Sequence, residues 1–316
     1  MISENELRAG LDRAAYVYDD ILISTVLVAL KLGRPILIEG AAGVGKTEVA
    51  KVLAEVLERP LIRLQCYEGL DESKALYEWN YQKQLLAIQV SMNRKEDTDD
   101  DLTRSLFSDE YLLERPLLAS IRSEEPAVLL IDEIDKADEE FEAFLLELLS
   151  EMQITIPEIG TVKSKTTPLV ILTSNRARPL SEALRRRCAY LYLAYPSVEK
   201  ELAILTRKMP NIDAQLALSV AEAVHTLRAN DAILKKPSIA ETLDWAAALE
   251  ALGITELDRD ALEQTKGFVL KNNEDLDEIH TLLPEGDCTE DCDCGGHGEA
   301  GHDHSHCAHH GNHHHA

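Results

Sequence analysis

Positive charge is scarce in this sequence, and a long apolar segment is missing from it. Its 32 lysines and arginines face 57 acidic residues, which gives a formal charge of -25. That balance argues against a nucleic-acid partner, since binding to a phosphate backbone rests on basic patches. The apolar runs at 21–30 and 128–131 are far shorter than the ~20 residues that cross a bilayer.

The N-terminal residues, MISENELRAG, also lack a basic start and the apolar core of a signal peptide. We therefore expect a cytoplasmic protein without a membrane span. Hydrophobic residues make up 45% of the chain and charged residues 28%, as in an ordinary globular protein with a full core. Cys66 and Cys188 stand alone in apolar surroundings, so we expect buried thiols of a reducing compartment, with no disulfide between them.

Lysine and arginine are absent from Pro284 onward, where the composition changes. Nine of the eleven histidines and four of the six cysteines lie in this part of the chain. It has almost no large apolar residue, so it cannot build a hydrophobic core unaided. We therefore predict that residues 284–316 are a disordered Cys/His-rich tail, separate from the body.

Residues 36–193 alternate short apolar runs with helical periods. The apolar positions of 49–57 fall at i, i+3, i+4, i+7 and i+8, which is one face of a helix, and 141–152 repeat that spacing. Near-continuous apolar strands joined by amphipathic helices indicate an α/β fold with a parallel sheet covered on both faces. The five predicted strands are 36–38, 61–64, 128–131, 169–172 and 189–193.

From Ser197 to about Leu283 the strand signals stop and helical periods remain. One of these helices is opened by a capping box at Ser238 and Glu241. We therefore divide the body into an α/β domain at 1–196 and a small all-helical domain at 197–283.

Two segments interrupt the α/β pattern. Residues of about 67–101 are predicted to be an insertion with a loop and a helix, ending in the acidic run 96–101, which we expect to be a solvated loop. Residues 153–168 alternate around a glycine and predict a β-hairpin.

A segment with the pattern G-x-x-x-x-G-K-[ST] follows the first predicted strand and precedes the first predicted helix. Glycines let the backbone turn its N–H groups toward phosphates, and the helix N-terminus adds its positive end. The lysine reaches the β/γ-phosphates, and the threonine hydroxyl can ligate Mg²⁺. A purely structural turn is the alternative. The predicted nucleotide-binding residues are Gly40, Ala41, Ala42, Gly43, Val44, Gly45, Lys46 and Thr47.

The apolar run from Val128 ends in two adjacent acids, Asp132 and Glu133. We expect Asp132 to hold the Mg²⁺ of ATP through water, together with Thr47, and Glu133 to orient and deprotonate the attacking water. The alternative for this pair is a solvated turn. Asp135 and Asp138 are expected to be surface or helix-start acids.

Two further positions complete a predicted ATPase site. Asn175 follows an apolar strand on a TSN turn and is expected to hold the nucleophilic water, the alternative being a turn asparagine. Three arginines, 185–187, precede the last strand. An arginine supplied in trans stabilises transition-state charge, an effect worth ~10³–10⁵ in rate. We favour Arg187, with Arg186 second; the alternative is a run that anchors a surface or a subunit contact.

The P-loop, the LLIDE strand, the TSN turn and the late arginine run, in that order, resemble an AAA+ ATPase. The resemblance implies a P-loop αβα core with a five-stranded sheet, a helical lid, ATP with Mg²⁺ as cofactors, and a ring oligomer, expected to be a hexamer. The insertion and the hairpin resemble the MoxR branch of these ATPases. More narrowly, LIEGAAGVGKTEVAKVLA, RLQCYEGLDESKALYEWNYQKQLL and KKPSIAETLDWAAAL are similar to the CoxD-like ATPases that mature carbon monoxide dehydrogenase.

This resemblance covers about residues 10–255 and implies a function. In that subgroup, ATP-driven remodelling is thought to help install a metal–sulfur site in a molybdenum enzyme. MoxR-type proteins commonly act with a partner bearing a von Willebrand A domain. The lid departs from the pattern, because many relatives carry an arginine there that touches the γ-phosphate, whereas 237–242 has none. Either Lys235 or Lys236 substitutes for it, or the site works without it.

The tail places many nitrogen and sulfur ligands on one segment. Thiolates favour Cu(I) and Zn²⁺, and imidazoles suit Zn²⁺, Ni²⁺ and Cu. The spacing is neither a Cys₂–His₂ finger nor a CxxC ribbon, so a labile store or delivery arm for several ions fits better than one closed site. The alternative is a disordered tail that binds metal only incidentally. The predicted ligands are Cys288, Cys292, Cys294, His297, His302, His304, His306, Cys307, His309 and His310.

The leading hypothesis is therefore a ring-forming ATPase that acts as a maturation chaperone for a metalloenzyme client, with the tail handling metal. A second hypothesis is a metal-storage protein or metallochaperone whose nucleotide domain only switches its shape or partners. A third is a general MoxR-type chaperone with an incidental tail.

Overall fold

The structure is a computed structural model that describes residues 2–94, 106–157 and 159–282. Residues 1–282 belong to one compact unit. The predicted disordered tail and the acidic run 96–101 lie outside the described residues. Among the helices that are described, none combines the length and the apolar character needed to cross a membrane.

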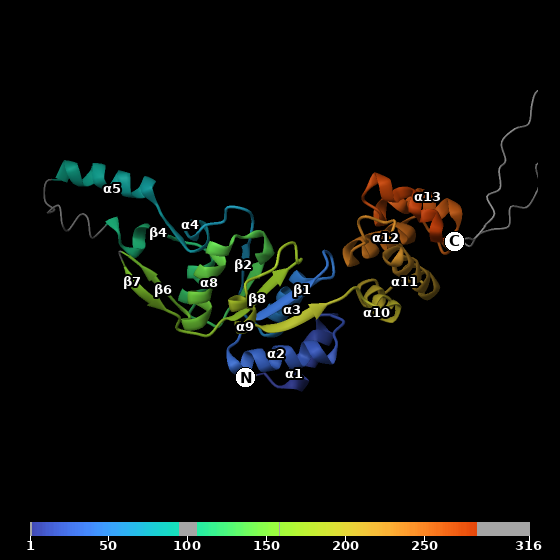
Figure 1. Ribbon diagram of the computed structural model, residues 1–316, viewed down its shortest axis with the longest axis horizontal. Helices are drawn as coiled ribbons and strands as arrows, with labels where there is room; N and C mark the ends of the chain where they lie inside the picture. The colour runs from blue at the N-terminus through green and yellow to red at the C-terminus, as the bar shows by residue number, and fades with distance from the viewer. Residues whose placement is uncertain (1, 95–105, 158, 283–316) are drawn as a thin grey trace, which may run out of the picture. The chain divides into compact units, whose positions relative to one another are not determined.

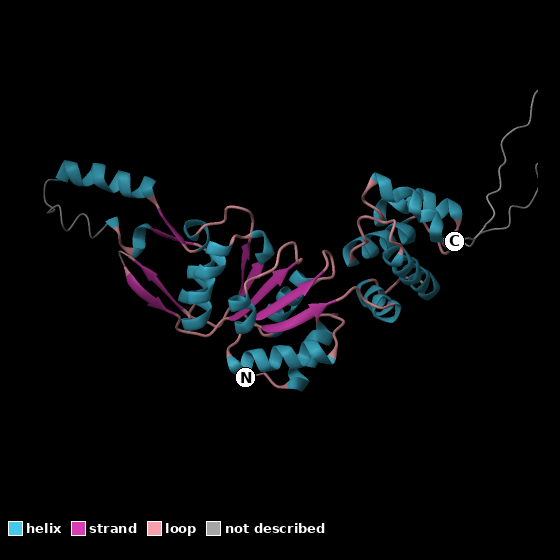
Figure 2. Ribbon diagram, in the orientation of Figure 1, coloured by secondary structure: helices cyan, strands magenta, loops and turns pink. Residues whose placement is uncertain are grey.

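A five-stranded parallel sheet organises the α/β part, as the sequence predicted (Figure 2). Every residue of the three central strands is buried, whereas the two edge strands are partly exposed. The carboxyl ends of parallel strands meet at one edge of a sheet, where ligands bind in open α/β folds. In spatial order the strands are β2 (Leu61–Gln65), β5 (Val128–Asp132), β8 (Leu169–Ser174), β1 (Ile36–Gly40) and β9 (Ala189–Leu193).

Helices cover both faces of this sheet (Figure 1). Successive side chains of a strand point to opposite faces of the sheet, so each strand contributes to the buried clusters on both faces. In β5, Val128 and Leu130 belong to one cluster, and Leu129 and Ile131 belong to the other. The cluster with Val128 includes α1 (Glu4–Arg13), α2 (Asp20–Leu32) and α3 (Lys46–Val56). The cluster with Leu129 includes α7 (Pro116–Arg122), α8 (Glu139–Glu151) and α9 (Glu182–Arg187).

The stretch after β2 that interrupts the α/β pattern extends to Glu114, beyond the predicted 67–101, and its described residues contain more structure than a loop and a helix. Two short strands in it pair antiparallel, and Trp79 packs edge-on against Phe107. Strands of three residues are too short for a sequence period to reveal them, so this part of the prediction was incomplete. In chain order the elements are α4 (Glu72–Ala75), β3 (Tyr77–Trp79), α5 (Tyr81–Arg94), the 3₁₀ helix η1 (Asp109–Tyr111) and β4 (Leu112–Glu114).

The predicted β-hairpin is confirmed, since β6 (Gln153–Ile156) pairs antiparallel with β7 (Gly160–Lys163). The predicted capping box is confirmed as well: Ser238 Oγ accepts from Glu241 N at 3.1 Å, and Glu241 Oε2 accepts from Ser238 N at 2.7 Å. The described residues after β9 are helical throughout their regular elements. These are α10 (Val198–Lys208), α11 (Ala214–Ala229), α12 (Ile239–Ala251), α13 (Arg259–Val269) and η3 (Asn273–Leu282).

Candidate functional site

The glycine-rich turn connects the end of β1 to the start of α3. Gly43 and Gly45 have φ angles of +78° and +88°, a backbone region that glycine adopts at little cost and other residues rarely enter. A Cβ at Gly40 would lie 2.2 Å from Leu193 O, so a side chain there would collide with β9. The turn is therefore a tight, strand-to-helix turn at the carboxyl edge of the sheet.

Lys46 opens α3 and folds back over this turn. Its Nζ donates to Gly40 O at 2.8 Å and to Ala41 O at 2.6 Å. Burial lowers the pKa of Lys46, while the nearby carboxylates of Asp135, Asp132 and Glu133 act in the opposite direction. A cation is thus held between the main chain of the turn and a group of acids.

Asp132 ends β5 and is 2% exposed. Its Oδ1 accepts hydrogen bonds from Thr47 Oγ1 at 3.0 Å and from Thr173 Oγ1 at 2.5 Å. Its Oδ2 pairs with the Arg63 guanidinium at 2.5 Å. The predicted pair Thr47 and Asp132 is therefore brought together, and two partners that the sequence analysis missed, Thr173 and Arg63, complete the surroundings of this carboxylate.

Glu133 and Asn175, predicted from separate motifs, lie side by side. Glu133 has a φ of +57° at the start of the 3₁₀ helix η2 (Ile134–Lys136), which turns its side chain away from the path of β5. Its Oε1 lies 3.4 Å from Asn175 Nδ2, and its Oε2 accepts from Gln65 Nε2 at 2.9 Å. Lys136 pairs with the same carboxylate at 2.6 Å. The roles predicted for Glu133 and Asn175 stay predictions, but their proximity is observed.

Asp135 corrects an expectation, because it is not a surface acid. It is 4% exposed, and its Oδ2 accepts from Asn175 N at 3.1 Å and from Ala177 N at 2.8 Å. The η2 turn directs this side chain inward, which a linear pattern does not reveal. Asp135 thus anchors the segment that presents Asn175. Asp138 does begin a helix as expected, since it caps α8 through Phe141 N at 2.8 Å.

We expect Asp135→Ala to destabilise the protein by about 2 kcal/mol, because two partly buried N–H groups would lose their charged acceptor. Asp138→Ala removes an exposed helix cap instead and should cost about 1 kcal/mol. Urea unfolding followed by circular dichroism measures both values. An Asp135→Ala variant no less stable than Asp138→Ala would contradict the anchoring role.

The three arginines of α9 have separate partners within the chain. Arg187 Nε donates to Ser150 Oγ of α8 at 2.9 Å. Arg186 is exposed and makes a surface ion pair on its own helix. Arg185 pairs with the buried carboxylate of Glu39 at 2.9 Å. A contribution of Arg187 or Arg186 to a neighbouring subunit therefore stays a prediction.

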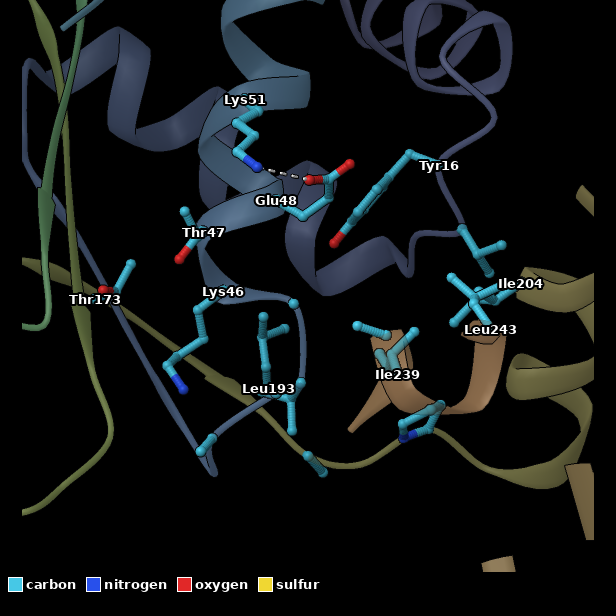
Figure 3. Close-up of a pocket in the computed structure, with 18 of the residues that line it drawn as sticks. Tyr16, Lys46, Thr47, Glu48, Lys51, Thr173, Leu193, Ile204, Ile239 and Leu243 are labelled. Atoms are coloured by element: carbon cyan, nitrogen blue, oxygen red, sulfur yellow. Dashed lines mark ion pairs between the residues drawn. The ribbon is translucent and has the colours of Figure 1, made fainter. Parts of the chain in front are cut away.

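A cavity of about 550 Å³ adjoins the glycine-rich turn (Figure 3). Its volume lies within the ~300–1,000 Å³ typical of small-molecule sites. One end is polar and contains Lys46, Thr47, Asp132, Glu133 and Asn175. The other end is apolar and is formed by side chains that the sequence analysis missed: Tyr16, Val17, Leu193, Ile204, Ile239 and Leu243.

The two lysines considered as lid substitutes do not line this cavity in the described part of the chain. Lys235 pairs with Glu241 at 3.3 Å, and Lys236 donates to Asn230 O. The lid contributes different cations, Lys200 and Lys208 of α10.

Cys66 and Cys188 are buried free thiols, which confirms that expectation. Burial raises the pKa of each thiol to about 12, and at Cys66 the carboxylates of Asp132, Asp135 and Glu133 add to the effect. The thiolate is the reactive form of cysteine, so neither residue is poised as a nucleophile.

We therefore expect both thiols to resist iodoacetamide at pH 8 in the folded protein and to react once urea unfolds it. In the unfolded chain a cysteine thiol has a pKa of ~8.5, well below its value of about 12 in the folded protein. The unfolded chain therefore loses its thiol protons first as pH rises, and the free energy of unfolding decreases from about pH 9 toward pH 12. Mass spectrometry of labelled peptides measures the modification. Rapid labelling of Cys66 under native conditions would contradict its burial.

Besides the Mg²⁺ site at Thr47 and Asp132, the sequence analysis predicted metal ligands only in the tail. Within 2–94, 106–157 and 159–282, no group of three or more His, Cys, Asp or Glu side chains is arranged to hold a metal ion. The predicted ligands from Cys288 to His310 lie outside these ranges.

Part of the chain matches a known domain family. Residues 35–188 match the family model of the AAA domain (dynein-related subfamily). The chain is 27% identical over 198 residues to the chaperone MoxR1 of Mycobacterium tuberculosis, covering 60% of this chain and 44% of that protein. It is also 27% identical over 184 residues to the uncharacterized protein SAB1265c of Staphylococcus aureus, covering 56% and 62%. These matches span less than two thirds of either relative.

Two solved structures are similar at low identity. One is a protein of Cytophaga hutchinsonii described as an ATPase, with 19% identity, 89% of this chain and 94% of that chain covered, and a TM-score of 0.46. The other is the RuvB Holliday junction branch migration motor of Thermotoga maritima, with 17% identity, 83% and 67% covered, and a TM-score of 0.43. Together, the AAA domain at 35–188 and the similarity to MoxR1 support a MoxR-like AAA+ ATPase.

Proposed function

We propose that this chain binds ATP with Mg²⁺ in the cavity beside Lys46 and hydrolyses it. One observation carries the proposal: a single cavity joins the glycine-rich turn, the Thr47–Asp132 pair and the Glu133–Asn175 pair at the carboxyl edge of one sheet. Phosphoryl transfer needs mainly positioning and charge stabilisation, and these groups supply both.

The residues fit a magnesium nucleotide. Thr47 Oγ1 and Asp132 Oδ1 lie 3.0 Å apart, and oxygen ligands of this kind are those that Mg²⁺ prefers. Lys46 offers an ammonium to phosphate oxygens. When bound, Mg²⁺ neutralises charge that develops on the phosphates during transfer. The apolar end of the cavity, with Tyr16 and Leu243, suits a nucleobase.

Glu133 is the proposed base, with Asn175 as its partner. A water held between the Glu133 carboxylate and the Asn175 amide would be oriented toward the terminal phosphate, and the carboxylate would take its proton. General-base catalysis of this kind contributes ~10²–10⁴-fold. Asp135 supports the arrangement because it fixes the backbone on which Asn175 stands.

We further propose that the chain forms a ring, expected to be a hexamer, in which Arg187, or Arg186 in second place, completes the neighbouring site. Arg187 would first have to release Ser150, whereas Arg186 is already exposed. The resemblance of the insertion and the hairpin to MoxR-type sequences supports ATP-driven remodelling of a client.

The proposed client is a metalloenzyme, specifically a molybdenum-containing dehydrogenase that needs assembly of a metal–sulfur site. A protein with a von Willebrand A domain is the proposed partner, in the cytoplasm. Support comes from the three sequence blocks that resemble the CoxD-like ATPases and from the tail, whose thiols and imidazoles suit Cu, Ni or Zn.

The primary test is ATP binding and phosphate release by the purified full-length chain with Mg²⁺. Failure to bind or cleave ATP under any metal condition overturns the proposal. The Glu133→Gln variant then serves as a trap: a pull-down with it, followed by metal analysis of the recovered complex, identifies the client.

The ligand-rich composition of the tail favours a second candidate function, metal storage with a nucleotide-switched domain. Deleting 284–316 separates the alternatives in vivo. Loss of function on deletion, with function retained in Glu133→Gln, supports storage. A silent deletion supports a general chaperone with an incidental tail, and loss in both variants supports the maturation ATPase.

A further inference from the structure

The glycine-rich turn is contacted at two consecutive main-chain carbonyls, one by the segment that leads from β9 into the helical lid and one by the lid itself. Tyr195, between β9 and α10, donates its hydroxyl to Ala42 O at 3.2 Å. Ile239, the first residue of α12, donates its N–H to Gly43 O at 3.1 Å. A Cβ at Gly43 would lie 2.2 Å from Ser238 Cβ, so the lid packs directly on main chain. N–H groups of such a turn face phosphates, whereas these two carbonyls receive donors from the linker before α10 and from the start of α12.

Arg228 of α11 holds both donors in place. Its guanidinium carbon lies 4.8 Å from the centre of the Tyr195 ring. Its Nε donates to Pro237 O at 2.8 Å, two residues before Ile239. The remaining edge pairs with both oxygens of Glu201, at 2.7 and 3.1 Å. The planar fork of arginine permits contacts in these several directions, and the ammonium of a lysine does not.

The Arg228–Glu201 pair is buried, with side chains 6% and 2% exposed. Burying two charges is costly, and such a pair is weak evidence for stability on its own. Its geometry points to positioning, because the same guanidinium fixes the ring of Tyr195 and the backbone that leads into α12. Within the described residues no arginine of the lid lines the cavity, and the hydrogen bonds seen on the outer side of the turn are those to Ala42 O and Gly43 O.

We infer that Tyr195 and Arg228 are positioning residues that hold the glycine-rich turn against the lid and thereby set the affinity for ATP. The inference rests on the proposed function and adds two residues to its machinery. The effect of the Tyr195 hydroxyl should fall on ATP binding rather than on the chemical step, because the hydroxyl touches the turn and not the groups proposed to act on water.

Tyr195→Phe tests this directly, since it keeps the ring on Arg228 and removes the bond to Ala42 O. We expect about 2- to 10-fold weaker ATP binding, the worth of one neutral hydrogen bond, with kcat changed less than twofold. Hydrogen exchange at the Ile239 amide, which is bonded to Gly43 O, should accelerate. The matched control is Tyr81→Phe, an exposed tyrosine of α5, which should behave like the wild type.

Arg228→Lys provides the second variant, since it keeps the charge beside Glu201 but loses the fork. It should raise the Kd for ATP and speed exchange at Ile239 at temperatures where the protein stays folded. Wild-type Kd and exchange in Tyr195→Phe, or a lower melting temperature in Arg228→Lys with an unchanged Kd, would overturn the inference. If the wild type binds no ATP, the proposed function fails, and exchange at Ile239 without nucleotide still decides whether the contact depends on Tyr195.

Discussion

Glu133→Gln is expected to slow steady-state ATP hydrolysis by about 10²–10⁴-fold, the contribution of a general base, and to leave ATP binding intact. Glutamine has the same shape as glutamate, and its single amide oxygen can accept from one of the two amides that donate to Glu133, Gln65 at 2.9 Å or Asn175 at 3.4 Å. It cannot accept a proton from water near neutral pH. Phosphate release gives kcat, and a fluorescent ATP analogue gives Kd.

The matched control is Glu139→Gln, which changes an exposed glutamate in the first turn of α8. It should retain wild-type turnover and affinity. Normal turnover in Glu133→Gln would reject Glu133 as the base. A loss of binding equal to the loss of turnover would assign Glu133 to holding the nucleotide and its metal instead.

The sheet could be predicted from the sequence because its strands are continuous apolar runs. Each residue of β5 is buried, so the run from Val128 is unbroken and its end at Asp132 is sharp. The strands β3 and β4 offered no comparable signal. Their three residues each include exposed positions such as Glu78 and Leu113, and their pairing depends on chain segments far apart in sequence.

The glycine-rich half of the candidate site was predictable as a strand-to-helix turn for a similar reason, since the residues from Gly40 to Thr47 are contiguous. The rest depends on contacts between distant segments. Gln65 and Glu133 are 68 residues apart, and no spacing rule links them. Thr173 was missed as well, although a signal for it existed, because it is a polar residue of the TSN turn directly after a buried apolar run. Asp135 was misread because burial of an acid after a strand end requires knowledge of the η2 turn.

Lys46→Ala is expected to weaken ATP binding by about 10²–10³-fold, since a hydrogen bond to a charged group contributes about 1.5–3 kcal/mol and a lysine makes more than one to phosphates. Hydrolysis at ordinary ATP concentrations should vanish with it. In the wild type, ATP at about 100 times its Kd should stabilise the fold by about 2.7 kcal/mol. Thermal melts with and without ATP measure this difference, which Lys46→Ala should lose. Lys31→Ala, an exposed lysine of α2, should keep it.

The alanine variant also removes the donor that satisfies Gly40 O and Ala41 O, so part of its effect falls on the turn itself. Lys46→Gln separates the two contributions, because an amide N–H still donates to these carbonyls but carries no charge. We expect Lys46→Gln to melt close to the wild type without nucleotide and to lose the stabilisation by ATP. If it is stabilised by ATP as strongly as the wild type, Lys46 only shapes the turn, and the phosphate-binding role is wrong.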